Sequence, residues 1–276
     1  MILPVLPGYH YIYNCPGNLS GATLMHIIAI ANQKGGVGKT TIAFNLAKTL
    51  AKRGHSVLAV DNDAQGNLTG SFLHDPEQLQ CDVLTIYNTD SKDKRQIVPQ
   101  QIEDKLHLIG ASIRLAKKIN RGDHTLLTKL TGGLKRVQGN FDFVLIDCSP
   151  SLDFLSMAAL IAAQHVLIPT KPAPYALMGL KDLFDTIEEI QEGLNKGITP
   201  LGILLNLVEG RETVIGQQYE SVLRETYGQL VFDSRLTKST KFEESPAFNQ
   251  SIQEYDTDGK LAEQFDAFTD ELLKRL

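Results

Sequence analysis

The sequence has no tryptophan, only three cysteines and no long run of apolar residues. Cys15, Cys81 and Cys148 show no close paired spacing, so they offer no zinc site and no redox disulfide, and reduced thiols are expected. No stretch approaches the roughly 18–20 consecutive apolar residues that a membrane-spanning helix needs. These absences predict a cytoplasmic protein with free thiols.

An excess of positive charge is also absent, because the formal net charge is −5 and the isoelectric point is about 5.8. A protein that coats nucleic acid through its overall charge is basic. Any nucleic-acid binding by this chain must therefore use a local patch. Hydrophobic residues make up 42% of the chain, enough to build a substantial core, so disorder is not expected.

Residues 1–24 contain no Asp, Glu, Lys or Arg and are rich in Pro, Gly, Tyr and Asn. They lack the basic start of a secretory signal. Met25 directly precedes an apolar run at 26–31. We expect the working protein to begin at Met25, with 1–24 a translated upstream segment or a disordered tail. An ordered lid or docking arm is the alternative.

The rest of the chain alternates short apolar runs with longer helical patterns. The runs are nearly continuous in Val, Ile and Leu, as in strands buried on both faces of a parallel sheet. The pattern predicts an α/β fold with a doubly wound, mostly parallel sheet flanked by helices, and one domain over 25–276. Strands are expected at 26–31, 56–61, 105–109, 141–147, 165–169, 201–206 and 230–232, and helices near 39–53, 112–120, 123–137, 151–163, 179–193, 213–227 and 258–275.

The first expected strand is followed by a glycine-rich phosphate-binding pattern. Glycines let the main chain turn tightly and bring its N–H groups against phosphate oxygens, and the next helix directs its positive N-terminus at the same place. Lys39 supplies a charge to the β- and γ-phosphates of ATP, and the Thr40 hydroxyl can ligate Mg²⁺. Gln33 stands where the standard pattern has its first glycine. The nucleotide-binding set is Lys34, Gly35, Gly36, Val37, Gly38, Lys39, Thr40 and Thr41.

Because Lys34 opens this loop, the run KGGVGKTT resembles the deviant phosphate-loop ATPases of the ParA/MinD family, and among them the ParA/Soj partition ATPases. In that family the signature lysine reaches across a dimer interface to the partner's nucleotide. The resemblance therefore implies that ATP joins two copies of the chain and that hydrolysis releases them. Lys34 would add positive charge where the transferring phosphoryl group builds up negative charge.

Two acidic runs complete the expected site, since Mg²⁺ and the attacking water need carboxylates. Asp63 matches the family's aspartate that polarises the water and helps to order the metal shell. Asp147, at the end of an apolar strand, is placed to hold Mg²⁺ together with Thr40. Departures from the family pattern are Ala64 after Asp63, which is expected to loosen that loop, and Ser149, each where proline is usual. Asp61 either contacts the metal shell or caps a strand end.

Asn206, at the end of the strand expected at 201–206, matches a position where the family often contacts the adenine base. A turn-capping role is the alternative for this residue. The resemblance extends from about Ile27 to near the C-terminus, and it is strongest at the two ATP-site runs.

Basic residues near the C-terminus resemble the DNA-contacting positions of partition ATPases. Residues 235–241 carry three positive charges and no acid, just before a Glu-x-Pro-like turn. These residues would contact phosphates without reading bases, so binding would be non-specific and salt-dependent. An ordinary solvated basic turn is the alternative. The expected contacts are Arg211, Arg235, Lys238 and Lys241.

The resemblance implies a slow ATPase in the cytoplasm whose ATP-bound dimer sits on the nucleoid and is released by a ParB-like activating partner. Alternatives are a positioning ATPase for a protein cargo, a membrane-bound MinD-like ATPase, an electron-transfer ATPase and a metabolic ligase. Acidic residues on the last helix argue against a membrane surface. Its apolar side chains are expected to pack on the core instead, at Leu261, Phe265, Phe268 and Leu272.

Overall fold

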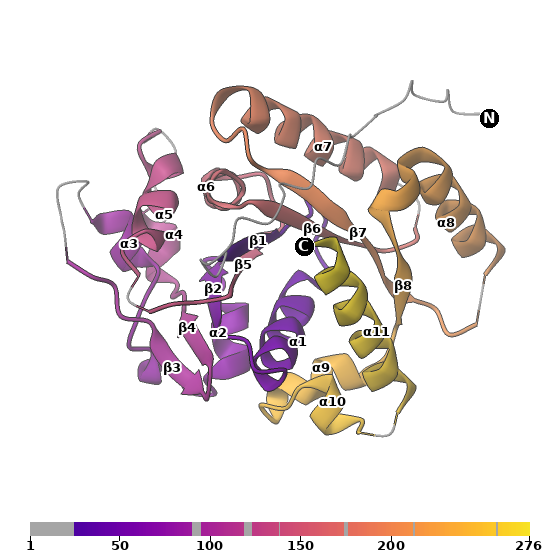
Figure 1. Cartoon of the computed structure of the whole chain (residues 1–276), viewed down its shortest axis with the longest axis horizontal. Helices are drawn as coiled ribbons and strands as arrows, with labels where there is room; N and C mark the ends of the chain where they lie inside the picture. Colours follow the sequence, from indigo (N-terminus) through magenta and orange to yellow (C-terminus); the bar gives the residue numbers. More distant parts are fainter. Residues whose placement is uncertain are drawn as a thin grey trace.

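The computed structural model describes residues 25–89, 95–118, 123–137, 139–173, 176–211, 213–257 and 259–276. The expected leader at 1–24 lies outside these residues. One eight-stranded sheet forms the centre, in the order β3-β4-β2-β5-β1-β6-β7-β8 (Figure 1). Neighbouring strands are parallel except β3 and β4. The strands are β1 (His26–Ile30), β2 (Val57–Asn62), β3 (Gln100–Glu103), β4 (Leu106–Ile109), β5 (Phe143–Cys148), β6 (His165–Thr170), β7 (Thr199–Val208) and β8 (Val231–Thr237).

Helices cover both faces of this sheet, which confirms the doubly wound fold (Figure 1). One hydrophobic core lies under α1 (Lys39–Lys52), α2 (Asn67–Phe72), α9 (Lys241–Ala247), α10 (Ile252–Tyr255) and α11 (Lys260–Arg275). The opposite core lies under α3 (Leu84–Asn88), α4 (Arg114–Lys118), α5 (Leu126–Leu134), α6 (Phe154–Ala162), α7 (Ala176–Gly193) and α8 (Val214–Tyr227).

The central strands β2 and β5 are buried along their whole length because both of their faces are covered. Every residue of β2 and of β5 is buried, including the acids at their carboxyl ends. In β7, burial runs from Pro200 to Asn206. This continuous burial is what the unbroken Val, Ile and Leu runs predicted.

Several elements differ from the expectation. The edge strand β3 was missed because Gln100–Glu103 holds one apolar residue, and an antiparallel edge strand needs no more. The short helices α2, α3 and α10 were missed because none of them completes two turns of apolar periodicity. The Glu-x-Pro-like turn expected after Lys241 is wrong, since Lys241–Ala247 forms α9 with Pro246 inside it.

The parallel strands present their carboxyl ends at one edge of the sheet, where ligands of open α/β folds bind. β1 lies between β5 and β6, so the loop after β1 is flanked by the ends of both. Asp61 of β2 and Asp147 of β5 are directly paired in register. The predicted site residues therefore gather from strands far apart in the sequence.

Candidate functional site

The loop between β1 and α1 has a main chain that only glycine adopts easily. Gly36 and Gly38 have φ angles of 69° and 87°, in the left-handed region. A Cβ on Gly38 would lie 2.3 Å from Asn206 Nδ2, so a side chain is excluded there by contact as well. Gly35 and Gly36 are exposed. A ligand can thus approach the main chain of this loop without meeting a side chain.

The helix α1 begins at Lys39, directly after the loop. No side chain caps its N-terminus, and Gly38 occupies the N-cap position. The first N–H groups of a helix have no acceptor within the helix. Together with the helix dipole they favour an anion at this point. Within the first turn, the Thr41 carbonyl accepts a hydrogen bond from Asn45 Nδ2 at 2.9 Å.

Lys39 is almost fully buried, and its ammonium group points back into the loop. Its Nζ donates to the carbonyl oxygens of Asn32 and Lys34, each at 3.1 Å. Burial lowers the pKa of Lys39, and the negative charge of Asp147 partly opposes this. The loop therefore holds the ammonium group of Lys39 in its centre, at the position where the sequence predicted a phosphate contact.

Thr40 and Asp147 meet although 107 positions separate them. Thr40 Oγ1 donates to Asp147 Oδ2 at 2.7 Å. Asp147 Oδ1 is buried and has no hydrogen-bond partner among the described residues. Burial, followed by the charge of neighbouring Asp61, raises the pKa of Asp147 well above its ordinary value. A hydroxyl and a carboxylate with a free buried oxygen are hard oxygen donors, so this pair fits Mg²⁺.

Asp61 and Asp63 have different roles. Asp61 is fully buried and accepts hydrogen bonds from the Thr69 N–H at 2.8 Å, the Thr69 hydroxyl at 2.7 Å and the Asp63 N–H at 3.2 Å. It anchors α2, and burial raises its pKa to about 6. Asp63 closes a local turn by accepting from the Gln65 N–H, and its charge is felt at Lys39. Asp63 thus lies close enough to the phosphate loop for its charge to act on Lys39, although less strongly than that of Asp147.

The loop after Asp63 forms a hydrogen-bonded turn, and its loosening by Ala64 stays a prediction. The Gly66 N–H donates to the Asp63 carbonyl at 3.0 Å, and Gly66 has a φ of 67°. Ala64 packs against the core under α3–α8. A glycine and one hydrogen bond shape the turn without proline.

Lys34 lies beside the loop with a half-buried side chain. Its N–H donates to Asn32 Oδ1 at 2.9 Å. Its Cγ and Cε each lie 3.8 Å from the point where a Cβ on Gly179 would stand, so the aliphatic stem runs along the start of α7. The structure holds one copy of the chain, and the reach of Lys34 into a partner stays a prediction.

Asn206 is buried at the carboxyl end of β7. Its Nδ2 donates to the Val37 carbonyl at 2.8 Å. This contact fixes the phosphate loop to β7, and it is a role that the sequence did not indicate. The expected contact of Asn206 with adenine stays a prediction.

The chain that carries this loop is similar to known proteins over most of its length. A family model described as an AAA domain matches residues 25–199. The chromosome partitioning protein ParA of Myxococcus xanthus is 34% identical over 265 residues, covering 94% of this chain and 92% of that protein. The chromosome-partitioning ATPase Soj of Thermus thermophilus is 36% identical over 256 residues, covering 90% of this chain and 96% of that protein. The chain belongs to the ParA/Soj family of ATPases.

Solved structures agree with this fold. Cobyrinic acid a,c-diamide synthase from Mycobacterium smegmatis, with bound ATP analogue and magnesium, is 28% identical with a TM-score of 0.72, over 91% of this chain and 95% of that one. An ATP complex of a McdA variant from Cyanothece is 22% identical with a TM-score of 0.78, over 91% of this chain and 96% of that one. The second likeness concerns the fold alone.

Three residues to which the sequence assigned no role support the ParA/Soj-type site. Asn62 Nδ2 donates to the Leu155 carbonyl at 2.7 Å, and Tyr87 OH donates to Asn62 Oδ1 at 2.8 Å. They tie the turn carrying Asp63 to the start of α6. Ser149 donates to Asp153, the N-cap of α6, at 3.0 Å. The position of Asn62 between two aspartates was the only signal in the sequence.

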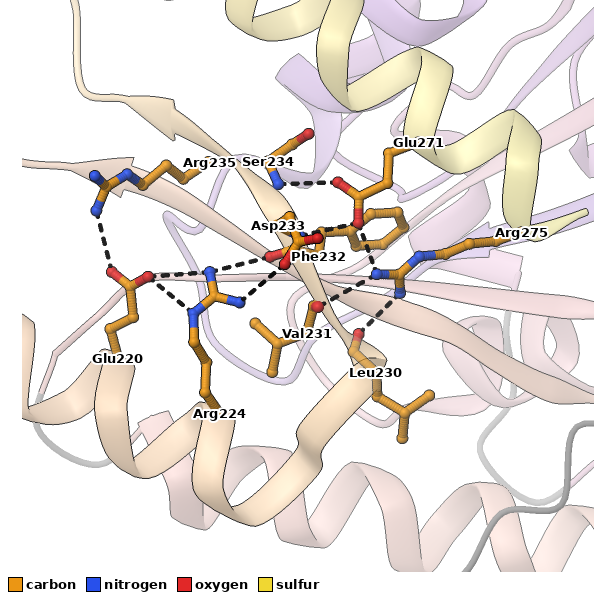
Figure 2. A network of polar contacts seen from close by, with 10 residues as sticks. All are labelled: Glu220, Arg224, Leu230, Val231, Phe232, Asp233, Ser234, Arg235, Glu271 and Arg275. Atoms are coloured by element: carbon orange, nitrogen blue, oxygen red, sulfur yellow. Dashed lines mark hydrogen bonds and ion pairs between the residues drawn. The ribbon is translucent and has the colours of Figure 1, made fainter.

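The expected DNA contacts of this ParA/Soj-type chain lie around the end of β8, and three of the four form ion pairs. Lys238 Nζ lies 3.0 Å from Glu209 Oε1, and Lys241 Nζ lies 2.5 Å from Asp256 Oδ1. Arg235 Nη1 lies 3.4 Å from Glu220 Oε2, and Glu220 also holds Arg224 (Figure 2). Arg211 is exposed. The four residues are brought to one region, but not as bare charges.

The last helix packs as the sequence predicted. Leu261, Phe265, Phe268 and Leu272 of α11 are buried in the core beside α1. Within the described residues, no helix is long and apolar enough to cross a membrane. The apolar face of α11 is thus used by the fold itself.

Proposed function

We propose that this chain is a partition ATPase that binds ATP with Mg²⁺, pairs with a second copy, and in that state binds DNA non-specifically. The observation that carries the proposal is the contact between Thr40 and Asp147, with the unpartnered Asp147 Oδ1, directly beside Lys39. That arrangement has the donors for a triphosphate and for its metal ion in one place. Hydrolysis would separate the copies and remove the DNA affinity that pairing adds.

Each side chain has a separate task in this mechanism. The α1 N-terminus and Lys39 bind the phosphates, and Thr40 with Asp147 would hold Mg²⁺, which neutralises phosphate charge when bound. Asp63 orients the attacking water. Lys34 stabilises the charge that develops on the phosphoryl group in the second copy.

The names of the relatives and one solved neighbour support this proposal. The relatives are named for chromosome partitioning, and the neighbour carries an ATP analogue with magnesium. From the same likeness we infer slow turnover, a ParB-like partner that stimulates it, and a place on the nucleoid in the cytoplasm. The cargo would be a plasmid or a chromosome.

Dimerisation is the first test. Sedimentation should show one copy with ADP and two copies with Mg²⁺ and a non-hydrolysable ATP analogue. Lys34→Ala should remain single under both conditions. Asp63→Ala should pair with ATP but not turn it over, because the water lacks its orienting group. A wild-type chain that stays single with the analogue contradicts the proposal.

DNA binding is the second test. The affinity for a duplex of mixed sequence should rise at least about tenfold with the ATP analogue compared with ADP or no nucleotide, because pairing doubles the phosphate contacts. Lys238→Ala/Lys241→Ala should remove most of that rise. The control is Lys196→Ala/Lys260→Ala, which removes the same charge from exposed positions elsewhere. Equal affinity in all nucleotide states removes the switch from the proposal.

A further inference from the structure

The segment around α4 and α5 is strongly basic within an acidic chain. Residues 112–140 contain seven Lys and Arg residues and one carboxylate, a formal charge of +6, whereas the whole chain carries −5. A local excess of positive charge attracts polyanions even when the molecule as a whole is negative. The proposed DNA contacts at β8 and α9 do not include any part of it.

Four of the basic side chains of this segment that the structure describes are open to solvent, and the fifth, Arg136, is half-buried and engaged elsewhere. Arg114, Lys117 and Lys135 are exposed and Lys129 is half-exposed. The side chains of these four form no ion pair or hydrogen bond with another described residue. Apart from the charge of Asp123 near Lys129, no described carboxylate has to be displaced when they meet an anion.

Asp123 is the one carboxylate of the segment, and it is already engaged. Its Oδ1 accepts hydrogen bonds from the Thr125 N–H at 3.0 Å and from the Thr125 hydroxyl at 2.6 Å. These bonds, followed by the charges of Lys129 and His124, lower the pKa of Asp123. Of the four basic side chains, Lys129 is therefore the one whose charge the segment's own acid partly offsets.

The β8–α9 region is the opposite case. Residues 209–256 contain five Lys and Arg residues and nine carboxylates. Its basic side chains Arg235, Lys238 and Lys241 are held by Glu220, Glu209 and Asp256. A phosphate must displace a carboxylate to reach any of these three.

β8 lies at the other end of the sheet from α4, and α9 covers the opposite face of the sheet from α4 and α5. α4 follows β4, the second strand in the sheet order, and β8 is the last strand (Figure 1). Ala116 of α4 and Leu127 of α5 line the same cavity beside α6, so the two helices share one side of the molecule. A ligand on α4 and α5 would not touch Lys238 or Lys241 of the same copy.

We propose that the α4–α5 surface, defined by Arg114, Lys117, Lys129 and Lys135, is a second binding surface for the phosphate backbone of nucleic acid. It contacts phosphates and does not read bases. It is complete in one copy of the chain, so it acts without nucleotide and without pairing. The inference goes beyond the proposed function, in which DNA binding depends on ATP.

The test compares two variants with the same change in charge. Arg114→Ala/Lys117→Ala/Lys129→Ala removes three cations from the surface. Lys196→Ala/Lys260→Ala/Lys274→Ala removes three exposed cations elsewhere. Duplex binding is measured by fluorescence anisotropy across a salt series, without nucleotide, with ADP and with the ATP analogue. Single-stranded RNA is the second probe, because it offers the same phosphates on another backbone.

The surface variant should bind duplex on the order of tenfold more weakly at low salt in every nucleotide state, and its salt slope should fall by about 2.7. The control variant should stay within about twofold of wild type, since non-contacting charges contribute little. Restoring the charge with Arg at 117 and 129 should recover most of the loss. Basal ATP hydrolysis and the thermal midpoint should match wild type in all variants, which checks the fold.

Two results would overturn the proposal. One is a surface variant whose affinity and salt slope equal those of the control. The other is a polyglutamate peptide that binds in a manner sensitive to the surface variant while duplex and RNA do not, which would make α4 and α5 a docking surface for an acidic protein. A retained rise of affinity with ATP in the surface variant keeps the proposed function separate from either result.

Discussion

The basic residues at the two ends of the sheet stand in opposite settings. At β8 and α9, each of Arg235, Lys238 and Lys241 lies against a carboxylate. On α4 and α5, the four cations of the proposed surface lie in solvent with no such partner among the described residues. The difference teaches that a run of Lys and Arg in the sequence does not by itself give the net charge that a ligand meets at the surface. Acids from other elements decide that, and Glu209 and Lys238 are 29 positions apart.

Pairing does not remove a cation from binding, but it lowers what binding gains. An exposed ion pair is worth about 0–1 kcal/mol, so a phosphate can displace the carboxylate. The displaced acid then stays nearby and repels the phosphate. A surface of paired cations therefore binds DNA best when two copies of the chain bind together. A surface of unpaired cations can bind DNA in a single copy.

Lys39→Ala is expected to give the largest effect. It tests whether DNA binding at β8 and α9 depends on nucleotide while DNA binding at α4 and α5 does not. Loss of the cation that contacts the phosphates should lower ATP hydrolysis by on the order of a thousandfold. The rise of DNA affinity with ATP, assigned to β8 and α9, should vanish with it. The binding assigned to α4 and α5 should persist. Hydrolysis rates and duplex anisotropy on one preparation measure both, and loss of all DNA binding contradicts the separation.

Lys48→Met extends the comparison to a buried lysine whose partner is partly exposed. Lys48 Nζ lies 2.6 Å from Glu103 Oε1 and 2.5 Å from the Asn249 carbonyl, and its side chain is 1% exposed. Removing the buried ammonium group, with its contacts to Glu103 and to the Asn249 carbonyl, should cost about 2–3 kcal/mol in the free energy of unfolding. Lys238→Ala, which breaks an exposed pair, should cost less than about 0.5 kcal/mol. Urea unfolding of the two variants checks the ranking, and equal costs would contradict it.

The surroundings of Lys48 also predict that stability depends on pH through Glu254. Burial acts to raise the pKa of Glu254, but the hydrogen bonds from Lys52 and the Ser251 N–H and the charge of Lys48 outweigh it and lower the pKa to about 2. Because the folded pKa is below the unfolded value near 4.5, the stabilisation is present above that pH and is lost as pH falls toward 2.

Glu254→Gln should therefore be less stable than wild type by about 1 kcal/mol near pH 6, since the carboxylate is partly exposed. The difference should shrink steadily below about pH 4.5. Urea unfolding at several pH values measures it. A difference that is constant with pH would assign the effect to packing instead of charge.

The smallest expected effect comes from removing the carboxylates that pair with Lys238 and Lys241, and it tests the comparison of paired and unpaired cations most directly. Glu209→Gln/Asp256→Asn frees Lys238 and Lys241, so duplex affinity with the ATP analogue should rise about threefold, with a steeper salt slope. The control is Glu243→Gln/Glu225→Gln, which removes two acids of the same region that form no ion pair with a described residue. Equal gains in both variants would show that general repulsion, and not pairing, limits the surface.

Much of the fold and the phosphate site could be predicted from the sequence. Parallel strands bring their carboxyl ends to one edge, so Asp147 and Thr40 were expected together although 107 positions separate them. The glycines and lysines of the loop are local features with direct chemical meaning. These predictions needed only the periodicity of the chain and one short motif.

The remainder depended on contacts that no local pattern encodes. The bond from Asn206 to Val37 spans 169 positions, and nothing near Asn206 indicates it. The pairing of Lys241 with Asp256 follows from α9 and α10 folding back together, and α9 was expected as a turn. The sequence left open whether Asp61 contacts the metal shell or caps a strand end, because the position of Thr69, which decides it, is not a local feature.

The amide of Asn206 gives the molecule a mechanical property. β7 is separated from β1 by β6, yet one hydrogen bond joins its end to the Val37 carbonyl. Gly38 sits against the same amide with no room for a side chain. A shift of β7 would therefore displace the main chain of the phosphate loop. Because α8 follows β7, a movement of α8 would reach the loop by the same route.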